Sequence, residues 1–160
     1  MFHVILYQPE IPPNTGNIIR LCANSGASLH LIGPLGFELD RKSVRRAGLD
    51  YGELTDVATY RDLGECLQRL ARARLFAVET PPRSLPVGER THGSYAHVRY
   101  QPQDVFLFGP ETRGLPPEVL AMTPLERRIH IQMRPGNRSL NLANAVAVVI
   151  YEAWRQNDFA

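Results

Sequence analysis

The sequence predicts an α/β protein with a mainly parallel sheet and helices on both faces. Short, apolar, β-rich runs alternate with helical patterns along the 160 residues, which is typical of such sheets. In addition, three strand-to-helix junctions carry Gly, Asn, Ser, Glu and Arg, more than a scaffold needs. Ligands bind at the carboxyl ends of strands in open α/β sheets, so these junctions are the candidate site. The length fits one domain, taken as residues 1–160.

The expected elements follow one another in regular order. Strands are expected where β-forming apolar residues cluster, and helices where apolar residues recur with helical spacing. The segment from Pro81 to Asp104 shows neither pattern, holds four prolines and is expected to be a long surface loop. The predicted strands are 3–7, 29–32, 57–60 (the weakest), 75–79, 105–108 and 128–132, and the predicted helices are 15–25, 41–51, 62–73, 116–122 and 140–156.

Composition excludes few functions. The net charge of +2, from 18 Lys and Arg against 16 Asp and Glu, does not by itself indicate a nucleic-acid partner. Lys42 is the only lysine, and arginine suits phosphate, although an arginine-favouring genome explains the bias equally well. Cys22 and Cys66 lack metal or redox spacing and fit reduced thiols of an intracellular protein. No signal peptide and no apolar run near ~20 residues is visible, so we expect a cytoplasmic protein without a membrane span. A metal is not expected either.

The first junction follows the strand that ends at residue 7. Pro12 and Pro13 are expected to keep the connection out of a helix. Asn14 or Thr15 would then cap the next helix and leave backbone N–H groups free near its start. Gly26 is expected to end that helix.

Arg20 is the notable residue of this helix. It shares a face with Asn17 and Asn24, and it lies early in the helix, where the macrodipole disfavours a cation. An exposed arginine on a solvated face is one interpretation. The other is an anion or phosphate site formed by Arg20, Asn14 and free N–H groups.

The second and third junctions also carry polar residues. Gly109 has no Cβ and would let a ligand approach the backbone, although a plain turn is the alternative. Glu111 is a carboxylate near a helix start, and the alternative is that it serves only as a helix-end residue. Ser139 is expected to cap the last helix. Tyr151 and Trp154 near its end serve core packing or, as we favour, an oligomer interface, because the helix is apolar around much of its circumference. Its apolar stripe consists of Leu142, Val146, Val149 and Ala153.

In this order, the junctions resemble the three motifs of the SPOUT (trefoil-knot) RNA methyltransferases. The matching segments are N-x-G-x-x-x-R from Asn14, F-G-P-E-x-x-G from Phe108 and S-x-N-x-x-N from Ser139. I-P-P-N-T-G-N-I-I-R-L-C-A-N from Ile11, R-R-A-G-L-D-Y from Arg45 and I-Y-E-A-W-R-Q from Ile150 are similar to one branch. That branch is the short tRNA 2′-O-methyltransferases acting at the wobble cytidine or uridine of leucine tRNAs. The resemblance covers nearly the whole chain.

The resemblance implies features that no pattern argument provides. It implies a deep trefoil knot near the C-terminus, S-adenosylmethionine (SAM) held bent in the knot, and an obligate homodimer with active sites near the interface. Residue by residue, SAM would lie among backbone groups around Val78, Gly109, Ile131, Ser139 and Leu140.

The implied reaction is methyl transfer from the SAM sulfonium to a ribose 2′-hydroxyl of tRNA. The enzyme must orient this hydroxyl and stabilise the negative charge that develops on its oxygen. Arg20 is the family's residue for this step and would clamp the adjacent phosphate, since a guanidinium is a poor base. Whether a deprotonated arginine or the phosphate takes the proton stays open. Asn14 would hold Arg20 or the ribose, Tyr151 would shape the RNA-side pocket, and Glu111 would organise the SAM loop.

Recognition of tRNA is expected to use the dimer surface. Two other functions stay open. Methylation of ribosomal RNA is disfavoured because no extra N-terminal RNA-binding domain is visible, and a non-catalytic RNA-binding module is disfavoured because Arg20, Glu111 and the third motif are intact. Candidate phosphate contacts, which a plain solvated face would also explain, are Arg41, Lys42, Arg45, Arg46, Arg134 and Arg138.

Overall fold

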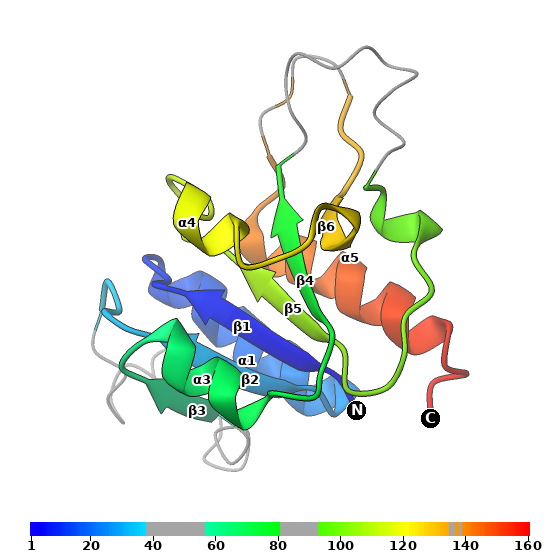
Figure 1. Ribbon diagram of the computed structural model, residues 1–160, viewed down its shortest axis with the longest axis horizontal. Coiled ribbons are helices and arrows are strands. Elements are labelled where there is room, and N and C mark those ends of the chain that lie inside the picture. The colour runs from blue at the N-terminus through cyan, green and yellow to red at the C-terminus, as the bar shows by residue number, and fades with distance from the viewer. Residues whose placement is uncertain (38–56, 81–92, 135–136, 138) are drawn as a thin grey trace.

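A six-stranded parallel sheet forms the centre of the molecule (Figure 1). The computed structural model describes residues 1–37, 57–80, 93–134, 137 and 139–160. The strand order is β3-β2-β1-β5-β4-β6, and each neighbouring pair is parallel, as predicted. The strands are β1 (His3–Tyr7), β2 (Ser28–Ile32), β3 (Val57–Tyr60), β4 (Leu75–Glu79), β5 (Val105–Phe108) and β6 (Arg128–His130), the last ending two residues earlier than expected.

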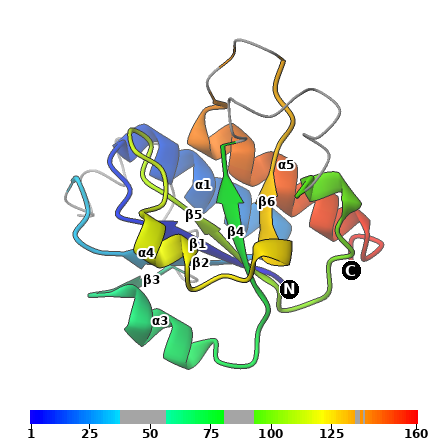
Figure 2. The ribbon, with the colours of Figure 1, turned by 45° about the horizontal axis from the view of Figure 1, so that its top comes forward.

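Helices cover both faces of the sheet, which confirms that prediction (Figure 2). On one face α1 and α5 pack together over a core that includes Phe106 and Phe108. On the other face α3 and α4 cover a second core, to which Leu63 and Val119 contribute. Because both faces are covered, all four residues of β5 are buried. The helices are α1 (Pro12–Ser25), α3 (Leu63–Arg69), α4 (Pro117–Leu120) and α5 (Leu142–Arg155), with 3₁₀ turns η2 (Tyr95–His97) and η3 (Leu125–Arg127).

The order of the strands places β1 beside β5, where a crevice is expected at the carboxyl ends of the strands. These strands are neighbours, with Leu6 paired to Phe108, so their carboxyl ends lie side by side. After β1 the chain enters α1 on one face, whereas after β5 it enters α4 on the other. Divergence of the two connections at a strand-order switch leaves room for a ligand at this edge of the sheet.

The start of α1 differs from the prediction. The helix begins at Pro12 rather than at residue 15, and Pro12 and Pro13 fill its first turn. Proline is well suited there, since its missing N–H would have no partner within the helix and its φ is already helical. Asn14 and Thr15 therefore lie inside the helix and do not cap it; the N-cap position is Ile11, whose side chain makes no capping bond.

The residues that end or cap the other helices were only partly predicted from the sequence. Gly26 ends α1 with a left-handed φ of 71°, as predicted. Asp62 caps α3, which stops at residue 69, four residues before its predicted end. Asn141, not Ser139, caps α5, and its side-chain oxygen accepts hydrogen bonds from the N–H groups of Ala143 and Asn144.

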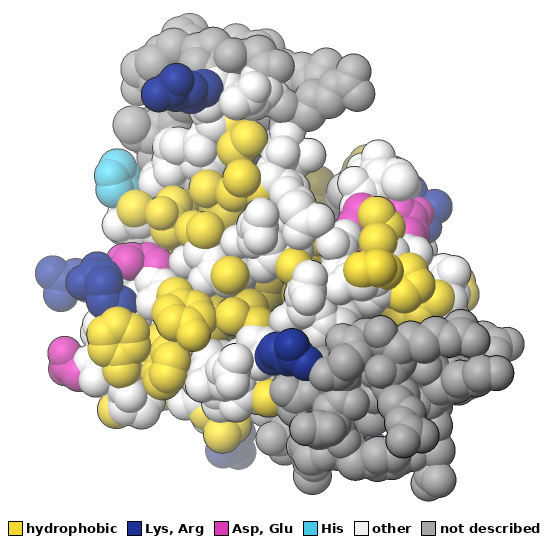
Figure 3. Space-filling model, turned by 180° about the vertical axis from the view of Figure 1, so that it is seen from behind, with side chains coloured by type: hydrophobic (Ala, Val, Ile, Leu, Met, Phe, Trp, Pro, Cys, Tyr) yellow, Lys and Arg dark blue, Asp and Glu magenta, His cyan; other side chains and the backbone are white. Residues whose placement is uncertain are grey.

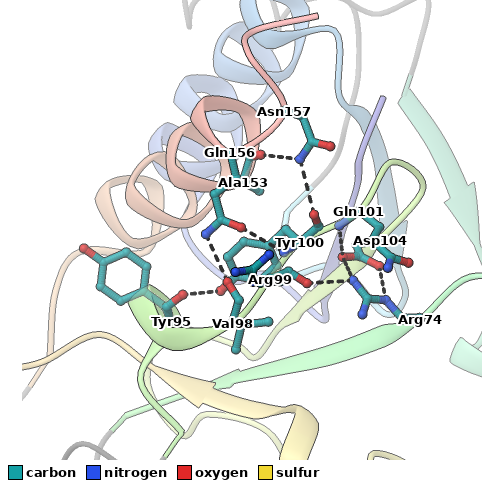
Figure 4. Close-up of polar contacts among 10 residues, drawn as sticks. All are labelled: Arg74, Tyr95, Val98, Arg99, Tyr100, Gln101, Asp104, Ala153, Gln156 and Asn157. Atoms are coloured by element: carbon teal, nitrogen blue, oxygen red, sulfur yellow. Dashed lines mark hydrogen bonds and ion pairs between the residues drawn. The ribbon is translucent and has the colours of Figure 1, made fainter.

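Part of the predicted long loop is held firmly against α5 (Figure 4). Residues 93–104 contain η2 and a bridge from Ser94 to β6, so this part is more ordered than a plain surface loop. The N–H of Tyr100 donates to the side chain of Gln156 at 2.9 Å. The nearly buried carboxylate of Asp104 binds Arg74 at 2.6 and 2.8 Å.

Several predictions fall on residues outside the described ranges. They are the helix at 41–51, the cations Arg41, Lys42, Arg45, Arg46 and Arg138, and residues 81–92 of the loop. In the part of the chain that the structure describes, every helix is too short or too polar to cross a membrane.

Candidate functional site

The carboxyl ends of β4, β5 and β6 open into a cavity of about 740 Å³. Small-molecule sites typically have volumes of about 300–1,000 Å³, so the cavity suits a nucleotide-sized ligand. Its wall combines apolar side chains with polar groups from all three junctions. The lining residues are Ile11, Asn14, Val78, Glu79, Thr80, Phe108, Gly109, Pro110, Glu111, Thr112, Arg113, Gly114, Leu115, Leu120, Ile131, Met133, Ser139, Leu140, Asn141, Leu142 and Ala145.

All five residues expected to bind the cofactor lie in this wall. Val78 and Gly109 are at the ends of β4 and β5, and Ile131 directly follows β6. Ser139 and Leu140 precede α5 and are exposed to the opening. Residues 61 positions apart in the sequence (Val78 and Ser139) are thus brought to one cavity, as the strand-end argument anticipated.

The structure gives a reason for glycine at position 109 that differs from the one expected from the sequence. A Cβ at this position would come within 2.4 Å of the backbone of Gly114 and Leu115. The loop after β5 therefore turns back upon its own start, and Gly114 supports the turn with a left-handed φ of 69°. The absence of a side chain at Gly109 is required by the loop itself, whether or not a ligand also approaches it.

Glu111 reaches from this loop to the start of α1. Its carboxylate accepts hydrogen bonds from the N–H groups of Glu10 at 2.8 Å and Ile11 at 3.2 Å, and from the side-chain amide of Asn14 at 3.1 Å. Because Ile11 provides no capping side chain, a carboxylate 97 to 101 residues away in sequence serves the start of α1. Its negative charge also suits the positive end of the helix dipole.

The segment before α1 also binds the loop after β5 in the opposite direction. The carboxylate of Glu10 accepts hydrogen bonds from the N–H of Thr112 at 3.1 Å and from its hydroxyl at 2.7 Å. The Thr112 hydroxyl holds the pKa of Glu10 below its usual value. Arg113 donates to the side chain of Gln8 at 3.0 Å. The first and second junctions are therefore joined along one wall of the cavity.

Asn14 connects this pair of loops to the third junction. Its side-chain oxygen accepts a hydrogen bond from the amide of Asn141 at 2.8 Å, while its own amide donates to Glu111. The oxygen of Asn141 is then free to cap α5, at 2.9 Å from the N–H of Ala143. Each amide donates through its nitrogen and accepts through its oxygen, so a single chain of hydrogen bonds runs from Glu111 through Asn14 and Asn141 into α5.

Arg20 and Tyr151 do not line the cavity. Arg20 lies on the exposed face of α1 with Asn17 and Asn24, which confirms the predicted grouping. Tyr151 is 44% exposed on α5 and meets Trp154 edge-on, with ring centroids 5.7 Å apart. The face formed by α1 and α5 carries broad hydrophobic areas (Figure 3). The structure thus divides the predicted site residues between the cavity and this outer face.

Asn141 and Glu79 are polar cavity residues that were not among the predicted ligands. Asn141 stands in the third motif, and its spacing from Ser139 was a usable signal. Glu79 directly follows Val78, and nothing in the strand pattern distinguishes it. Burial raises the pKa of the Glu79 carboxyl, while Arg128 and His130 act in the opposite direction.

The cysteines play no part in this site. Both are buried and free, and burial raises the pKa of Cys22 to about 12 and that of Cys66 to about 11. Within the described ranges, no three His, Cys, Asp or Glu side chains gather as a metal site would require.

Comparison with known proteins gives consistent matches over the whole chain. The model of the SpoU rRNA Methylase family matches residues 1–151. A tRNA (cytidine(34)-2′-O)-methyltransferase of Methylovorus glucosotrophus is 52% identical, over all of this chain and 98% of that protein. One of the same name from Escherichia coli K12 is 53% identical, over 98% of this chain and 94% of that protein.

Solved structures agree in fold. A structure described as giving insights into the 2-OH methylation of C/U34 on tRNA superposes with a TM-score of 0.85 at 43% identity, covering 100% of this chain and 98% of the other. The methyltransferase AviRb of Streptomyces viridochromogenes, in complex with the cofactor AdoMet, has a TM-score of 0.75 at 27% identity, covering 98% of this chain and 57% of the other.

Proposed function

Because this chain belongs to the SpoU rRNA methylase family, we propose that it transfers a methyl group from SAM to the ribose 2′-oxygen of nucleotide 34 of tRNA. The observation that carries the proposal is the cavity at the strand ends, in which all five expected SAM residues meet. The substrate follows from relatives that align from end to end at 52 and 53% identity and are tRNA (cytidine(34)-2′-O)-methyltransferases. Wobble uridine is included because the 43% identical structure concerns both C34 and U34.

The cavity fits SAM in size and chemistry. Val78, Ile131 and Leu142 provide apolar surface for an adenine ring, and the backbone of the loop from Gly109 to Gly114 provides polar groups. SAM supplies an activated methyl group when bound. The chain's own task is to hold the cofactor among Val78, Gly109, Ile131, Ser139 and Leu140 and to present the ribose to it.

Arg20 is the proposed catalytic residue. A guanidinium keeps its positive charge at neutral pH and offers several N–H donors in a planar fork. It therefore stabilises negative charge developing on the 2′-oxygen and holds the neighbouring phosphate, which fixes the angle of attack. Tyr151 lies on the same outer face and shapes the RNA side of the pocket.

Asn14 acts mainly as a positioning residue in this proposal. Its amide bridges Glu111 and Asn141 and so sets the start of α1 relative to the cofactor loop. Since Arg20 follows on the same helix, about 9 Å further along its axis, the bridge also sets where Arg20 stands. Glu111 keeps the role expected from the sequence, that of organising the cofactor loop, and does so by binding it to α1.

We propose that two copies complete each site. Arg20 and Tyr151 lie on the face formed by α1 and α5 rather than in the cavity, so a second copy docked there would bring a substrate-binding surface beside the cofactor. Tyr151, Phe159 and Leu140 are exposed hydrophobic side chains, and Tyr151, Trp154 and Phe159 form a row of ring contacts suited to an interface. Sedimentation velocity of wild type and Tyr151→Glu tests this; a wild-type monomer would overturn it.

Further parts of the proposal rest on the family. The trefoil knot near the C-terminus follows from membership in it, and we treat residues 1–160 as one such domain. Leucine isoacceptors are the proposed substrates, in the cytoplasm where tRNA is modified. Methylation of ribosomal RNA is the second candidate, and only the name of the family favours it. The more distant methyltransferase AviRb is 27% identical, and the match covers 57% of its chain.

The test is methyl transfer from labelled SAM to total tRNA from cells that lack the enzyme, followed by nucleotide mapping. Wild type should label a wobble 2′-oxygen, and Arg20→Ala should lose that label while keeping SAM affinity. Arg72→Ala, an exposed arginine remote from the site, is the matched control and should behave as wild type. SAM binding without tRNA labelling would redirect the proposal to ribosomal RNA, and absence of SAM binding would refute it.

A further inference from the structure

Among the described residues, the cavity wall contains two carboxylates with opposite surroundings. The carboxylate of Glu111 already accepts three hydrogen bonds from donors at the start of α1. Glu79 lines the same cavity, but no hydrogen bond or ion pair reaches its carboxylate among the residues that the structure describes. One acidic group of the wall is therefore structural, and the other is available to a ligand.

Glu79 is placed by the end of β4. It follows Val78, an expected cofactor contact, and it pairs in register with His130 of the neighbouring strand β6. Arg128 and His130 favour the ionised carboxylate, whereas burial disfavours it and dominates, so its pKa is raised. Because Glu79 is half-buried and its carboxylate accepts no hydrogen bond from the described residues, its ionised form is less favourable than in water, and a ligand that brings donors would offset this cost.

The ligand of the proposed function offers four kinds of group to a carboxylate: the ribose hydroxyls, the adenine amino group, the ammonium and the sulfonium. Of the two neutral donors, only the ribose presents two adjacent hydroxyls that one carboxylate can bind together. Arg128 and His130 act on Glu79 from β6, and the positive charge of Arg128 disfavours a second cation there. Neutral hydroxyl donors meet no such repulsion. The two oxygens of one carboxylate can also accept from the two hydroxyls of a ribose cis-diol at once.

We propose that the Glu79 carboxylate binds the ribose hydroxyls of the cofactor's adenosine. The inference rests on the proposed function and adds to it a specificity-determining residue that acts on the nucleoside part of SAM. Glu79 would select for the intact ribose and would contribute equally to the binding of substrate and product cofactor, since both carry the same adenosine.

The experiment is calorimetric binding of three cofactor-related ligands to wild type, Glu79→Gln and Glu79→Ala. The ligands are SAM, S-adenosylhomocysteine, which lacks the sulfonium charge, and 5′-methylthioadenosine, which also lacks the amino acid. The expected result is a similar loss of affinity for all three, about tenfold for Glu79→Gln and no smaller for Glu79→Ala. Glu118→Gln removes an exposed carboxylate on α4 and should bind all three as wild type does.

Two further readouts test the stability of the variant and its contact with the ribose. The melting temperature of ligand-free Glu79→Gln should equal or exceed that of wild type, since a half-buried carboxylate whose charge is disfavoured by burial is replaced by a neutral amide. For 2′-deoxy-5′-methylthioadenosine, the difference between wild type and Glu79→Gln should shrink, because one hydroxyl is already missing. An undiminished difference would assign Glu79 to the adenine amino group and would overturn the inference.

The pattern of losses decides the outcome. A loss for SAM alone would assign Glu79 to the sulfonium, and a loss for SAM and S-adenosylhomocysteine alone would assign it to the ammonium. Either result overturns the inference, as does unchanged binding of all three. Wild type that binds none of the ligands would overturn the proposed function, and the inference with it.

Discussion

Substitution of Glu111 tests whether the hydrogen-bond chain between the junctions holds the site together. Glu111→Ala removes three accepted hydrogen bonds, from Glu10, Ile11 and Asn14. At about 1 kcal/mol for each net hydrogen bond, the loss would approach 3 kcal/mol, and because water can reach this half-buried site we expect about 2 kcal/mol. For a chain of 160 residues this corresponds to a fall in melting temperature of about 4–8 °C.

Glu111→Gln provides a finer test of the same geometry. Whichever way the amide is turned, its NH₂ group must face an N–H donor at one of the two oxygen positions. With its oxygen toward Ile11 and Asn14, the variant loses only the Glu10 contact, so we expect about 1 kcal/mol. Glu126→Gln, an exposed carboxylate on η3, is the control and should change stability by less than about 0.5 kcal/mol.

Thermal and urea denaturation measure these differences, and calorimetry measures SAM affinity in parallel. Since Asn14 lies between Glu111 and Asn141, the losses in Glu111→Ala and Asn141→Ala should not add in the double variant, with a coupling of at least about 0.5 kcal/mol. Strict additivity, or a Glu111→Ala variant as stable as the Glu126 control, would refute the reasoning.

Three further predictions concern other parts of the molecule. Asp104→Asn should lower the free energy of unfolding by about 2 kcal/mol, seen as a lower urea midpoint, because Asp104 is buried and pairs with Arg74. Burial lowers the pKa of His30 to about 4 from 6.5, so the unfolded chain binds the proton more tightly; stability should fall by up to about 3 kcal/mol as the pH drops from about 6.5 to about 4, and His30→Gln should flatten this slope. At pH 8, Cys22 and Cys66, with pKa values of about 12 and about 11, should react with a thiol reagent only after denaturation, and rapid reaction of the native protein would contradict their burial.

The sequence alone determined the kind of fold and the places where function would be found. Strand and helix periodicities are local, so β1 through β5 were located almost to the residue, and Gly26 marked a helix end correctly. Polar residues after apolar runs pointed to the strand ends, and the residues there line one cavity.

The tertiary structure decided which groups meet. Asn14 and Glu111 are 97 residues apart, and Asn14 and Asn141 are 127 apart, so no local pattern could predict that these side chains bind one another. Strand order brings β1 beside β5, and this adjacency lets Glu111 serve a helix start that Asn14 and Thr15 were wrongly expected to cap. It also separates Arg20 from the cavity and leaves Glu79 within it without a donor among the described residues. Periodicity specifies which face a residue occupies, whereas its partners depend on which strands become neighbours.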